Sequence, residues 1–599
     1  MNAIVDAPQR EAALHPARSF IVQAPAGSGK TGLLIQRFLR LLAVVERPEE
    51  ILAITFTRKA AAEMRRRVLE ALAAAASPTP PTKDNERTTW ELARAALERD
   101  RARDWQLARN AARLRILTID ALCTSLAHQM PVLSRLGAAP AIVEDSSDLF
   151  REAAERTLAL VEKDEPVSRL VRLVLLHMDG DWSGTRYIIE EMLRRRDHWM
   201  RRIEGFAARA EVRESLERSF RNERARVMRR AAELMPGELV GEVCRHARYA
   251  ADRVEDPASP VRALADLEGY PSADEEGSLA WCGLAELLLT AQGDWRKTVT
   301  KTQGFPTGGA AERQAKAEMI ELLTERLPAH DVAREALQAV RKAPPDRFTD
   351  AQWEILGALV EVLRRAAATL KDVFAERGEI DFSGIAQAAV EALGEEDAPT
   401  DLLLALDVRV QHLLVDEFQD TSLTQWELLK RLTAGWSEGD GRTAFLVGDP
   451  MQSIYRFREA EVALFMHARA RGLPSVRLES LALRTNFRSQ AGLVEWFNET
   501  FAKVLPPVED AEAGAVPYAP SSSHHPAADG VAVAWHPFTG PDPDAGHEAE
   551  AQRVAELARD AEAGSVAILV RGRAHLDRIV PALKQAGVRF RAVDIEPLR

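Results

Sequence analysis

The stretch S-F-I-V-Q-A-P-A-G-S-G-K-T, residues 19–31, decides the fold class of this 599-residue chain. Its apolar start predicts a short buried strand, and the residues beyond its end have helical spacing. Between the two elements, Gly27 and Gly29 would let backbone N–H groups approach a phosphate closely, because glycine has no Cβ. In a loop of this kind Lys30 reaches the β- and γ-phosphates, and the hydroxyl of Thr31 ligates Mg²⁺. The stretch therefore predicts a phosphate-binding loop between a strand and a helix.

A second stretch, H-L-L-V-D-E-F-Q-D-T-S at residues 412–422, supplies the carboxylates that such a loop needs. A buried strand would deliver Asp416 and Glu417 at its carboxyl end, where Asp416 can hold Mg²⁺ through water and Glu417 can polarise an attacking water. The usual loop pattern has a glycine where this chain has Ala24, so the first stretch alone could be a glycine-rich turn. The two stretches together predict a nucleotide hydrolase.

The fold class follows from six short apolar runs that end abruptly in small or polar residues. Such runs are typical of buried parallel strands, and helical patterns follow most of them. We therefore expect an α/β fold whose ligands bind at the carboxyl ends of the strands. The six runs are residues 20–23, 51–55, 115–119, 412–417, 444–448 and 566–570.

The middle of the chain has a different texture. From about Asp145 to Asp372 the residues show helical spacing and no convincing strand, so we expect an all-helical domain inserted into the α/β domain. A smaller polar interruption at residues 77–87 precedes another helical piece at 88–113. Residues 506–530 are rich in proline and serine and predict a linker that splits the last α/β region.

The overall composition is that of a soluble globular protein, with 46% hydrophobic and 28% charged residues. No run approaches the roughly 18 apolar residues of a membrane span, and the N-terminus lacks a signal peptide's apolar core, so we expect no membrane association. The three cysteines, Cys123, Cys244 and Cys282, lie far apart without the spacing of a metal site or a disulfide framework. A reducing, cytoplasmic location is the simplest interpretation.

The net charge of −12 does not by itself favour nucleic-acid binding. Two stretches differ from the rest, because residues 192–202 and 217–230 are rich in arginine and carry aromatic side chains. They could follow a phosphate backbone. The favoured alternative is a solvated helix face with acid–base pairs at i,i+4, because basic surface helices are common.

The loop A-P-A-G-S-G-K-T and the later D-E-F-Q-D-T resemble the UvrD/RecB-like superfamily I DNA helicases, in which the first loop position is commonly Ala or Gly. Further family segments are similar to stretches of this chain in the same order. They are residues 6–10 (Q motif), 54–67 (motif Ia), 117–123 (the next DNA-contacting segment), 445–458 (motif III), 483–489 (motif IV), and 566–571 with 586–590 (part of the second motor domain). The D-E-F-Q-D-T-S-x-T-Q pattern and G-E-I-D-F at 378–382 lean toward the RecB/AddA branch.

The resemblance implies ATP and Mg²⁺ as cofactors and gives each matching residue a role. Gln9 would read adenine and Phe487 could stack on it, Gln452 would sense the γ-phosphate, and Arg488 resembles an arginine finger. The nucleotide-binding loop would comprise Ala24, Pro25, Ala26, Gly27, Ser28, Gly29, Lys30 and Thr31, with Thr31 and Asp416 as metal ligands and Lys30, Glu417, Gln452 and Arg488 as catalytic residues.

Two clusters of aromatic and basic residues predict contacts with single-stranded DNA. Phe56, Thr57 and Arg58 follow a predicted strand and open a helix, which would place an aromatic platform, a hydroxyl and a cation near a helix N-terminus. In the second cluster, stacking groups again alternate with cations just past a strand end. The alternative for the phenylalanines is packing in the core. The second cluster consists of Tyr455, Arg456, Phe457 and Arg458.

The chain departs from the family pattern in three places. The resemblance adds Thr118 to the DNA contacts, but Asp120 stands where the family often has His, and an acid would repel phosphate. Phe457 replaces a frequent Trp and should still stack. No counterpart of motif V, of motif VI with its ATP-contacting arginine, or of the RecB/AddA nuclease is found before Arg599, so we expect an excised fragment of a longer protein, with a natural truncation as the alternative.

We therefore predict a P-loop NTPase, a DNA-dependent ATPase and helicase that moves 3′ to 5′ on single-stranded DNA in repair or recombination. The expected layout is a RecA-like motor domain at residues 1–144 and 373–474, a 1B-like helical insertion at 145–372, and a partial second RecA-like domain at 475–599. The partners would be single-stranded DNA, single-/double-stranded junctions or ends, and a nuclease or RecB/AddA-type subunit. Two alternatives stay open: an ATP-binding, non-hydrolysing scaffold within a DNA-processing complex, or the helicase half of a helicase–nuclease whose nuclease lies beyond residue 599.

Overall fold

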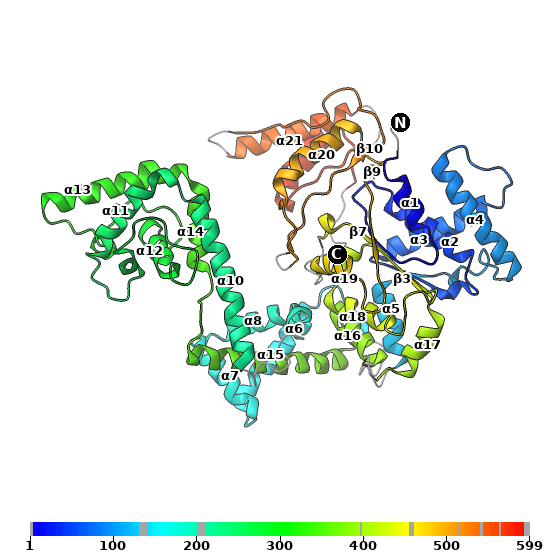
Figure 1. Cartoon of the computed structure of the whole chain (residues 1–599), viewed down its shortest axis with the longest axis horizontal. Coiled ribbons are helices and arrows are strands. Elements are labelled where there is room, and N and C mark those ends of the chain that lie inside the picture. The colour runs from blue at the N-terminus through cyan, green and yellow to red at the C-terminus, as the bar shows by residue number, and fades with distance from the viewer. Residues whose placement is uncertain are drawn as a thin grey trace.

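The fold contains a six-stranded parallel sheet with the strand order β3-β2-β6-β7-β1-β8. Figure 1 labels β3 and β7 of this sheet, which lies in the right half of the view. The computed structural model describes residues 4–130, 140–200, 210–395, 398–454, 460–511, 514–539, 543–561 and 565–591. The predicted α/β class with a parallel sheet is confirmed, and five of the six predicted strands lie in this sheet. The strands are β1 (Phe20–Gln23), β2 (Ile51–Thr55), β3 (Arg115–Thr118), β6 (His412–Val415), β7 (Thr443–Gly448) and β8 (Glu479–Ala482).

The inner strands are buried on both faces, which is why they appear in the sequence as continuous apolar runs. Successive side chains still point to opposite faces. In β1, Phe20 and Val22 belong to one hydrophobic core and Ile21 belongs to another. The first core contains α1 (Ala7–Ala13), α2 (Lys30–Leu42), α3 (Arg58–Ala74) and α4 (Asp84–Ala102); the second contains α5 (Ile119–Gln129), α16 (Phe382–Leu393), α17 (Asp401–Arg409), α18 (Leu423–Leu432) and α19 (Ala463–Arg471).

The chain leaves the sheet after β3 for a long helical region and returns before β6. Two short strands lie side by side where it leaves and returns, because β4 (Ala141–Ile142) pairs in parallel with β5 (Glu379–Ile380). Part of the region shares the second core of the sheet; these helices are α6 (Ser147–Leu158), α7 (Pro166–His177), α8 (Trp182–Arg194), α9 (Arg196–Trp199) and α15 (Asp350–Arg377).

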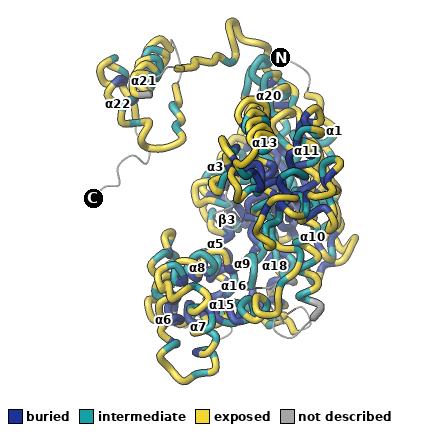
Figure 2. Tube along the Cα trace, turned by 90° about the vertical axis from the view of Figure 1, so that its left-hand side faces the viewer, coloured by how far each residue is buried: buried dark blue, intermediate teal, exposed yellow. Residues whose placement is uncertain are grey.

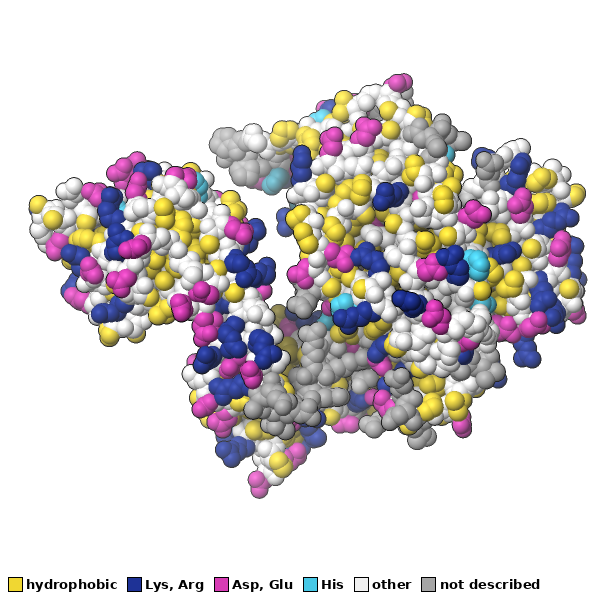
Figure 3. Space-filling view, viewed as in Figure 1, with side chains coloured by type: hydrophobic (Ala, Val, Ile, Leu, Met, Phe, Trp, Pro, Cys, Tyr) yellow, Lys and Arg dark blue, Asp and Glu magenta, His cyan; other side chains and the backbone are white. Residues whose placement is uncertain are grey.

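The rest of the helical region forms a lobe with a hydrophobic core of its own. Figure 3 shows this lobe standing apart from the rest of the molecule, and Figure 1 shows α10 running from it to the helices around α15. Its helices are α10 (Ala210–Leu234), α11 (Val240–Ala251), α12 (Ser278–Leu288), α13 (Ala310–Glu321) and α14 (Asp331–Lys342).

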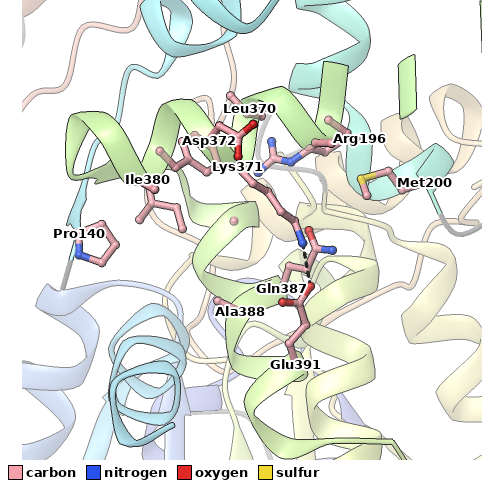
Figure 4. Close-up of a pocket in the computed structure, with 15 residues that line it drawn as sticks. Pro140, Arg196, Met200, Leu370, Lys371, Asp372, Ile380, Gln387, Ala388 and Glu391 are labelled. Carbon is pink, nitrogen blue, oxygen red and sulfur yellow. Dashed lines mark hydrogen bonds and ion pairs between the residues drawn. The ribbon is translucent and has the colours of Figure 1, made fainter. Parts of the chain in front are cut away.

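A cavity of about 330 Å³ lies where α9, α15 and α16 meet. Figure 4 shows the side chain of Lys371 pointing across it to Glu391, and the two form an ion pair of 2.9 Å. Arg196 lines the same cavity and pairs with Asp381 at 2.7 Å. These two ion pairs lie at a cavity among helices of the second core and not at the phosphate loop.

The C-terminal segment contains the one predicted strand that is wrong. Residues 566–570 are described and form no strand, and Leu569 is 93% exposed. A strand needs a neighbouring backbone to pair with, and among the described residues none pairs with this run. Figure 2 shows α21 and α22 largely exposed around a small core of their own. The elements here are β9 (Thr485–Asn486), α20 (Ala491–Val504), β10 (Ser522–Ser523), α21 (Pro543–Asp560) and α22 (Leu576–Gln585).

Within the described part of the chain, no helix has both the length and the apolar character needed to cross a membrane.

Candidate active site

The phosphate loop connects β1 to α2 and is held by the neighbouring strand, since the Ala24 N–H donates to the carbonyl of Gly448 at 2.8 Å. Gly27 and Gly29 adopt left-handed backbone angles, with φ of 79° and 77°, which favour glycine. Ala24 is buried and does not adopt a positive φ, so a side chain with a Cβ is tolerated there. The position that departs from the usual pattern therefore needs no glycine.

The two predicted carboxylates lie at the carboxyl end of β6, beside the loop. Asp416 is buried, its N–H donates to the carbonyl of Ile54 on β2 at 2.9 Å, and burial raises the pKa of its carboxyl group to about 6. Glu417 adopts a left-handed φ of 53°, which is rare for a residue with a side chain and is typical of functional sites. Its Oε2 forms an ion pair with Lys30 Nζ. The structure thus brings the lysine of the first motif against the carboxylate of the second.

Gln419 connects these carboxylates to the end of β7. Its Nε2 donates to Glu417 Oε2 at 2.8 Å and to Asp420 Oδ2 at 3.2 Å, and its Oε1 accepts the Asp449 N–H at 2.9 Å. Asp449 in turn accepts a hydrogen bond from the side-chain amide of Gln452, which is exposed. Burial raises the pKa of Asp449 and raises that of Asp420 to about 7. The predicted γ-phosphate sensor is therefore two hydrogen-bonded residues away from Glu417.

A segment far along the chain lies directly on the phosphate loop. The N–H of Phe487 donates to the carbonyl of Gly27 at 2.8 Å, and Asn486 Nδ2 donates to the carbonyl of Ala26 at 3.2 Å. A Cβ on Gly27 would lie 3.0 Å from the Cβ of Arg488, whose side chain is exposed. The predicted stacking residue and the predicted arginine finger are thus both at the loop.

The N-terminal helix fastens this segment to the loop. Asp6 is buried and accepts the N–H groups of Arg484 and Thr485 at 2.6 and 3.0 Å. Arg10 donates to Asp6 at 2.8 Å and to the Ser28 carbonyl of the loop at 2.7 Å. These hydrogen bonds from Arg10 and from the backbone amides hold the pKa of Asp6 below its usual value despite burial.

The ring of Phe487 has a cationic neighbour, Arg10, and an aromatic neighbour, His524. The Arg10 guanidinium carbon is 5.0 Å from the centre of its ring, and the ring of His524 is 5.1 Å away at an angle of 57°. Gln9, predicted to read adenine, has a buried Oε1 that finds no hydrogen-bond donor among the described residues. An unpaired buried acceptor suits a ligand that donates to it.

The predicted DNA contacts lie at the same edge of the sheet, on the other side of β6. Phe56 is half-buried, while Thr57 and Arg58 are exposed where β2 ends and α3 begins. Thr118 is buried, and it pairs in register with Thr55 at the end of β3. Both hydroxyls cap helices: Thr57 accepts the N–H of residue 60 at 3.0 Å and Thr118 that of residue 121 at 3.1 Å. Tyr455, Phe457 and Arg458 lie outside the described residues.

Several arginines of the two arginine-rich stretches form ion pairs with acidic residues. In the first, Arg194 and Arg195 both reach Glu191, and Arg196 is buried in its pair with Asp381. In the second, three of the six arginines, Arg218, Arg224 and Arg226, have side-chain partners, and Figure 3 shows basic and acidic side chains interspersed over α10. The second-stretch pairs are Arg218–Glu214 and Arg226–Glu223, and Arg224 donates to Ser278. The structure favours the acid–base interpretation for these residues.

The residues at the loop fit a nucleotide with Mg²⁺. Gly27 and Gly29 have no Cβ, so a phosphate can approach the backbone N–H groups of the loop closely. Ser28 Oγ is buried with no partner in the described part of the chain. Thr31 and Asp416 offer the oxygen ligands that Mg²⁺ prefers. Lys30 supplies the cation for phosphate.

The sequence prediction places five residues of this site inside its motifs but gives them no role. They join segments that lie far apart in the chain, so no local periodicity marks them. Their only local signal was that they stand inside or next to the predicted motifs. The five are Asp6, Arg10, Gln419, Asp449 and Asn486.

A phosphate loop after β1 and an Asp-Glu pair after β6, on one parallel sheet, place the protein among the P-loop nucleotide-binding proteins. The UvrD/REP helicase N-terminal domain matches residues 5–471, which is most of the chain. The chain belongs to this helicase family, and the predicted family is confirmed.

The chain is also similar to curated relatives that are called subunits of an ATP-dependent helicase/nuclease. It is 27% identical over 542 residues to the one from Lysinibacillus sphaericus (81% of this chain, 38% of the relative) and 28% over 540 residues to the one from Moorella thermoacetica (84% and 35%). The relative from Geobacillus thermodenitrificans is 26% identical over 524 residues (82% and 38%). The chain thus spans a little over a third of the length of these relatives.

Proposed function

We propose that this chain carries the ATP-hydrolysing motor of a DNA helicase that moves 3′ to 5′ on single-stranded DNA and acts in repair or recombination. One observation carries the proposal: Lys30 pairs with Glu417, hydrogen bonds connect Glu417 to Gln452, and residues 486–488 lie on the phosphate loop, all at one edge of the sheet. Family membership supports both the nucleotide and the nucleic acid as ligands.

Each residue at the loop has a role in this proposal. ATP would be held by the loop from Ala24 to Thr31, with its base between Gln9 and Phe487. Mg²⁺, held by Thr31 and Asp416, would supply charge neutralisation at the phosphates. Lys30 binds the phosphates, and Glu417 takes the proton of the attacking water.

Two further residues would respond to the γ-phosphate. Gln452 stands on the loop after β7 and reports the state of the nucleotide to the DNA-facing residues that follow it. Arg488 stabilises charge as it develops in the transition state, because a preorganised cation is most effective where charge appears.

DNA would cross the carboxyl edge beside β2 and β3. Phe56 offers a face for a base, and Arg58 offers a cation near the start of α3 for a phosphate. Tyr455, Phe457, Arg458 and Thr118 are the further proposed contacts. Base stacking is tolerant of sequence, so we expect little sequence preference.

The domain layout is also part of the proposal. Residues 1–144 and 373–474 would form the first RecA-like domain, residues 145–372 its 1B-like insertion, and residues 475–599 part of a second RecA-like domain with a linker at 506–530. The side-by-side strands β4 and β5 support this layout, because they bring both ends of the insertion to one place.

The relatives' name supports a proposal about partners. They are called helicase/nuclease subunits, so we propose that the protein works on DNA ends or junctions together with a nuclease activity and a partner chain. The alternative function is a scaffold that binds ATP without hydrolysing it, and a measurement of ATP hydrolysis distinguishes it from a motor.

The test is ATP hydrolysis with and without single-stranded DNA, measured on this chain and on its full reading frame. Lys30→Ala should abolish hydrolysis, because the phosphates lose their lysine. Lys371→Ala, which removes a lysine paired with Glu391 away from the loop, is the matched control and should keep activity. Normal hydrolysis by Lys30→Ala would refute the proposed site, and ATP binding without hydrolysis by the wild type would identify a scaffold.

A further inference from the structure

We propose that Gln419 is a positioning residue for hydrolysis: it holds the carboxylate of Glu417 and ties it to Asp449, beside the proposed γ-phosphate sensor. The inference rests on the proposed function and concerns a residue that none of the proposed ligand contacts includes. Gln419 lies between β6 and α18 and is 1% exposed, so solvent does not compete for its amide.

The three hydrogen bonds of this amide fix its orientation. Two carboxylates, of Glu417 and Asp420, accept from Nε2 at 2.8 and 3.2 Å, and the backbone N–H of Asp449 donates to Oε1 at 2.9 Å. An amide has two N–H donors at one end and an acceptor at the other. Turning it over would place Oε1 against the Glu417 carboxylate and Nε2 against the Asp449 N–H, so a single orientation satisfies the site.

The hydrogen bond from Gln419 to Glu417 contributes most to the position of the Glu417 carboxylate when a nucleotide is bound. Glu417 Oε2 has two described partners, Lys30 Nζ and Gln419 Nε2. When Lys30 binds the phosphates, its ion pair with Glu417 weakens. The Gln419 amide then remains as the hydrogen-bond partner of Glu417 Oε2. A general base must stay within hydrogen-bond reach of its proton, so an amide that keeps the carboxylate in place favours the reaction.

The other end of Gln419 faces the loop after β7. Asp449 accepts from the Gln452 side chain, and the hydroxyl of Ser453 donates to the backbone carbonyl of Gln419 at 3.3 Å. A Cβ on Gly448 would lie 2.3 Å from Gln419 Oε1, so the close approach of the amide to β7 requires a glycine there. Movement of this loop would therefore be transmitted to the orientation of Glu417.

Two substitutions separate the amide's donors from its shape. Gln419→Glu keeps the size and removes the N–H donors, and Gln419→Met fills a similar volume without polar atoms. We expect kcat of DNA-stimulated hydrolysis to fall about tenfold to a hundredfold in both, as for the loss of a hydrogen bond to a charged group. The affinity for a fluorescent ATP analogue should change by less than about threefold, since a residue that acts in the chemical step affects kcat and not ground-state binding.

Gln425→Ala is the matched control. Gln425 is buried in the same segment, but its Oε1 accepts the N–H of Ser422 at the start of α18 and does not contact the carboxylates. It should lower the thermal midpoint while leaving kcat near the wild-type value. Each variant is measured beside the wild type and beside Lys30→Ala.

The outcomes are distinct. Retained kcat in Gln419→Glu would mean that shape and not the donors matters, and would overturn the inference. Parallel loss of analogue binding and kcat in both Gln419 variants would assign the residue to holding the fold, and would overturn it as well. A wild type that fails to hydrolyse ATP contradicts the proposed function instead, whatever the variants do.

Discussion

Replacing the loop glycines by alanine tests whether residues 486–488 dock on the phosphate loop. At Gly27, an added Cβ would lie 2.6 Å from Asn486 Oδ1, and the backbone has a φ of +79°. The Asn486 side chain cannot move away freely, because its Oδ1 accepts the N–H groups of Arg488 and Ser489 at 2.8 and 2.9 Å. The left-handed conformation costs alanine about 1–2 kcal/mol and each lost hydrogen bond about 1 kcal/mol. We therefore expect Gly27→Ala to cost about 3–4 kcal/mol of stability.

Two neighbouring glycines provide the comparison. Gly29 has a similar φ of +77°, but a Cβ there would lie 3.5 Å from Phe487 Cδ2, an ordinary contact, so only the backbone cost of about 1–2 kcal/mol applies. Gly32 lies inside α2 and a Cβ would meet nothing within 4 Å, so Gly32→Ala should stabilise the helix by about 0.5–1 kcal/mol.

The assay is the thermal unfolding midpoint of the transition that nucleotide binding shifts. A destabilisation of 1 kcal/mol lowers the midpoint by about 2–4 °C for a cooperative unit of 150–250 residues. The expected order of midpoints, from lowest to highest, is Gly27→Ala, Gly29→Ala, wild type and Gly32→Ala. Equal midpoints for Gly27→Ala and Gly29→Ala would refute the docking of residues 486–488 on the loop, since only the first variant clashes with that segment, whereas the second makes an ordinary contact with it.

Single residues give three further predictions. Arg10→Ala should cost about 1.5–3 kcal/mol, because it removes charged hydrogen bonds to Asp6 and to the loop, whereas Arg18→Ala, at a solvent-exposed pair, should leave the thermal midpoint nearly unchanged; thermal midpoints compare the two variants. The pKa of Asp420 is raised from 3.8 to about 7, so the folded state binds more protons than the unfolded state between these values and stability falls as pH rises through them. Asp420→Asn should therefore stabilise by up to about 4 kcal/mol above pH 7 and have no such effect below about pH 4; a constant difference across that range would contradict this. Phe56→Ala should weaken single-stranded DNA binding by about 1–3 kcal/mol in fluorescence anisotropy and leave ATP affinity unchanged; unaltered DNA binding would place Phe56 in the core alone.

The central sheet could be predicted from the sequence because its inner strands are buried on both faces. Such strands form apolar runs that are visible in a single sequence. The first and last residues of β1, β2, β6 and β7 all lie within two residues of the predicted boundaries. The same rule fails at residues 566–570, where the apolar run has no pairing partner among the described residues. An apolar run predicts a strand only when a neighbouring strand is available.

The contacts that complete the site could not be predicted in the same way. Asp6 accepts a hydrogen bond from Arg484, 478 positions later in the chain, and no periodic pattern links them. Gln419 and Asp449 stand inside predicted motifs, but which atoms they join depends on the placing of β6 beside β7. Motif spacing therefore predicts which chemical groups meet at an edge, while the hydrogen bonds that orient them depend on the tertiary structure.

The strand order explains how one sheet could serve two ligands. β6 lies between β2 and β7, so the segment with Asp416 and Glu417 has the proposed DNA-facing residues after one neighbour and Asp449 with Gln452 after the other. The N–H of Asp416 is hydrogen-bonded to Ile54, two residues before Phe56, and Gln419 is hydrogen-bonded to Asp449. A shift at the end of β6 would therefore reach both neighbours through direct hydrogen bonds. If hydrolysis is coupled to movement on DNA, the shortest route between the two sites is across these three strands, and Gln419 variants that uncouple DNA stimulation from basal hydrolysis would mark the β7 side of that route.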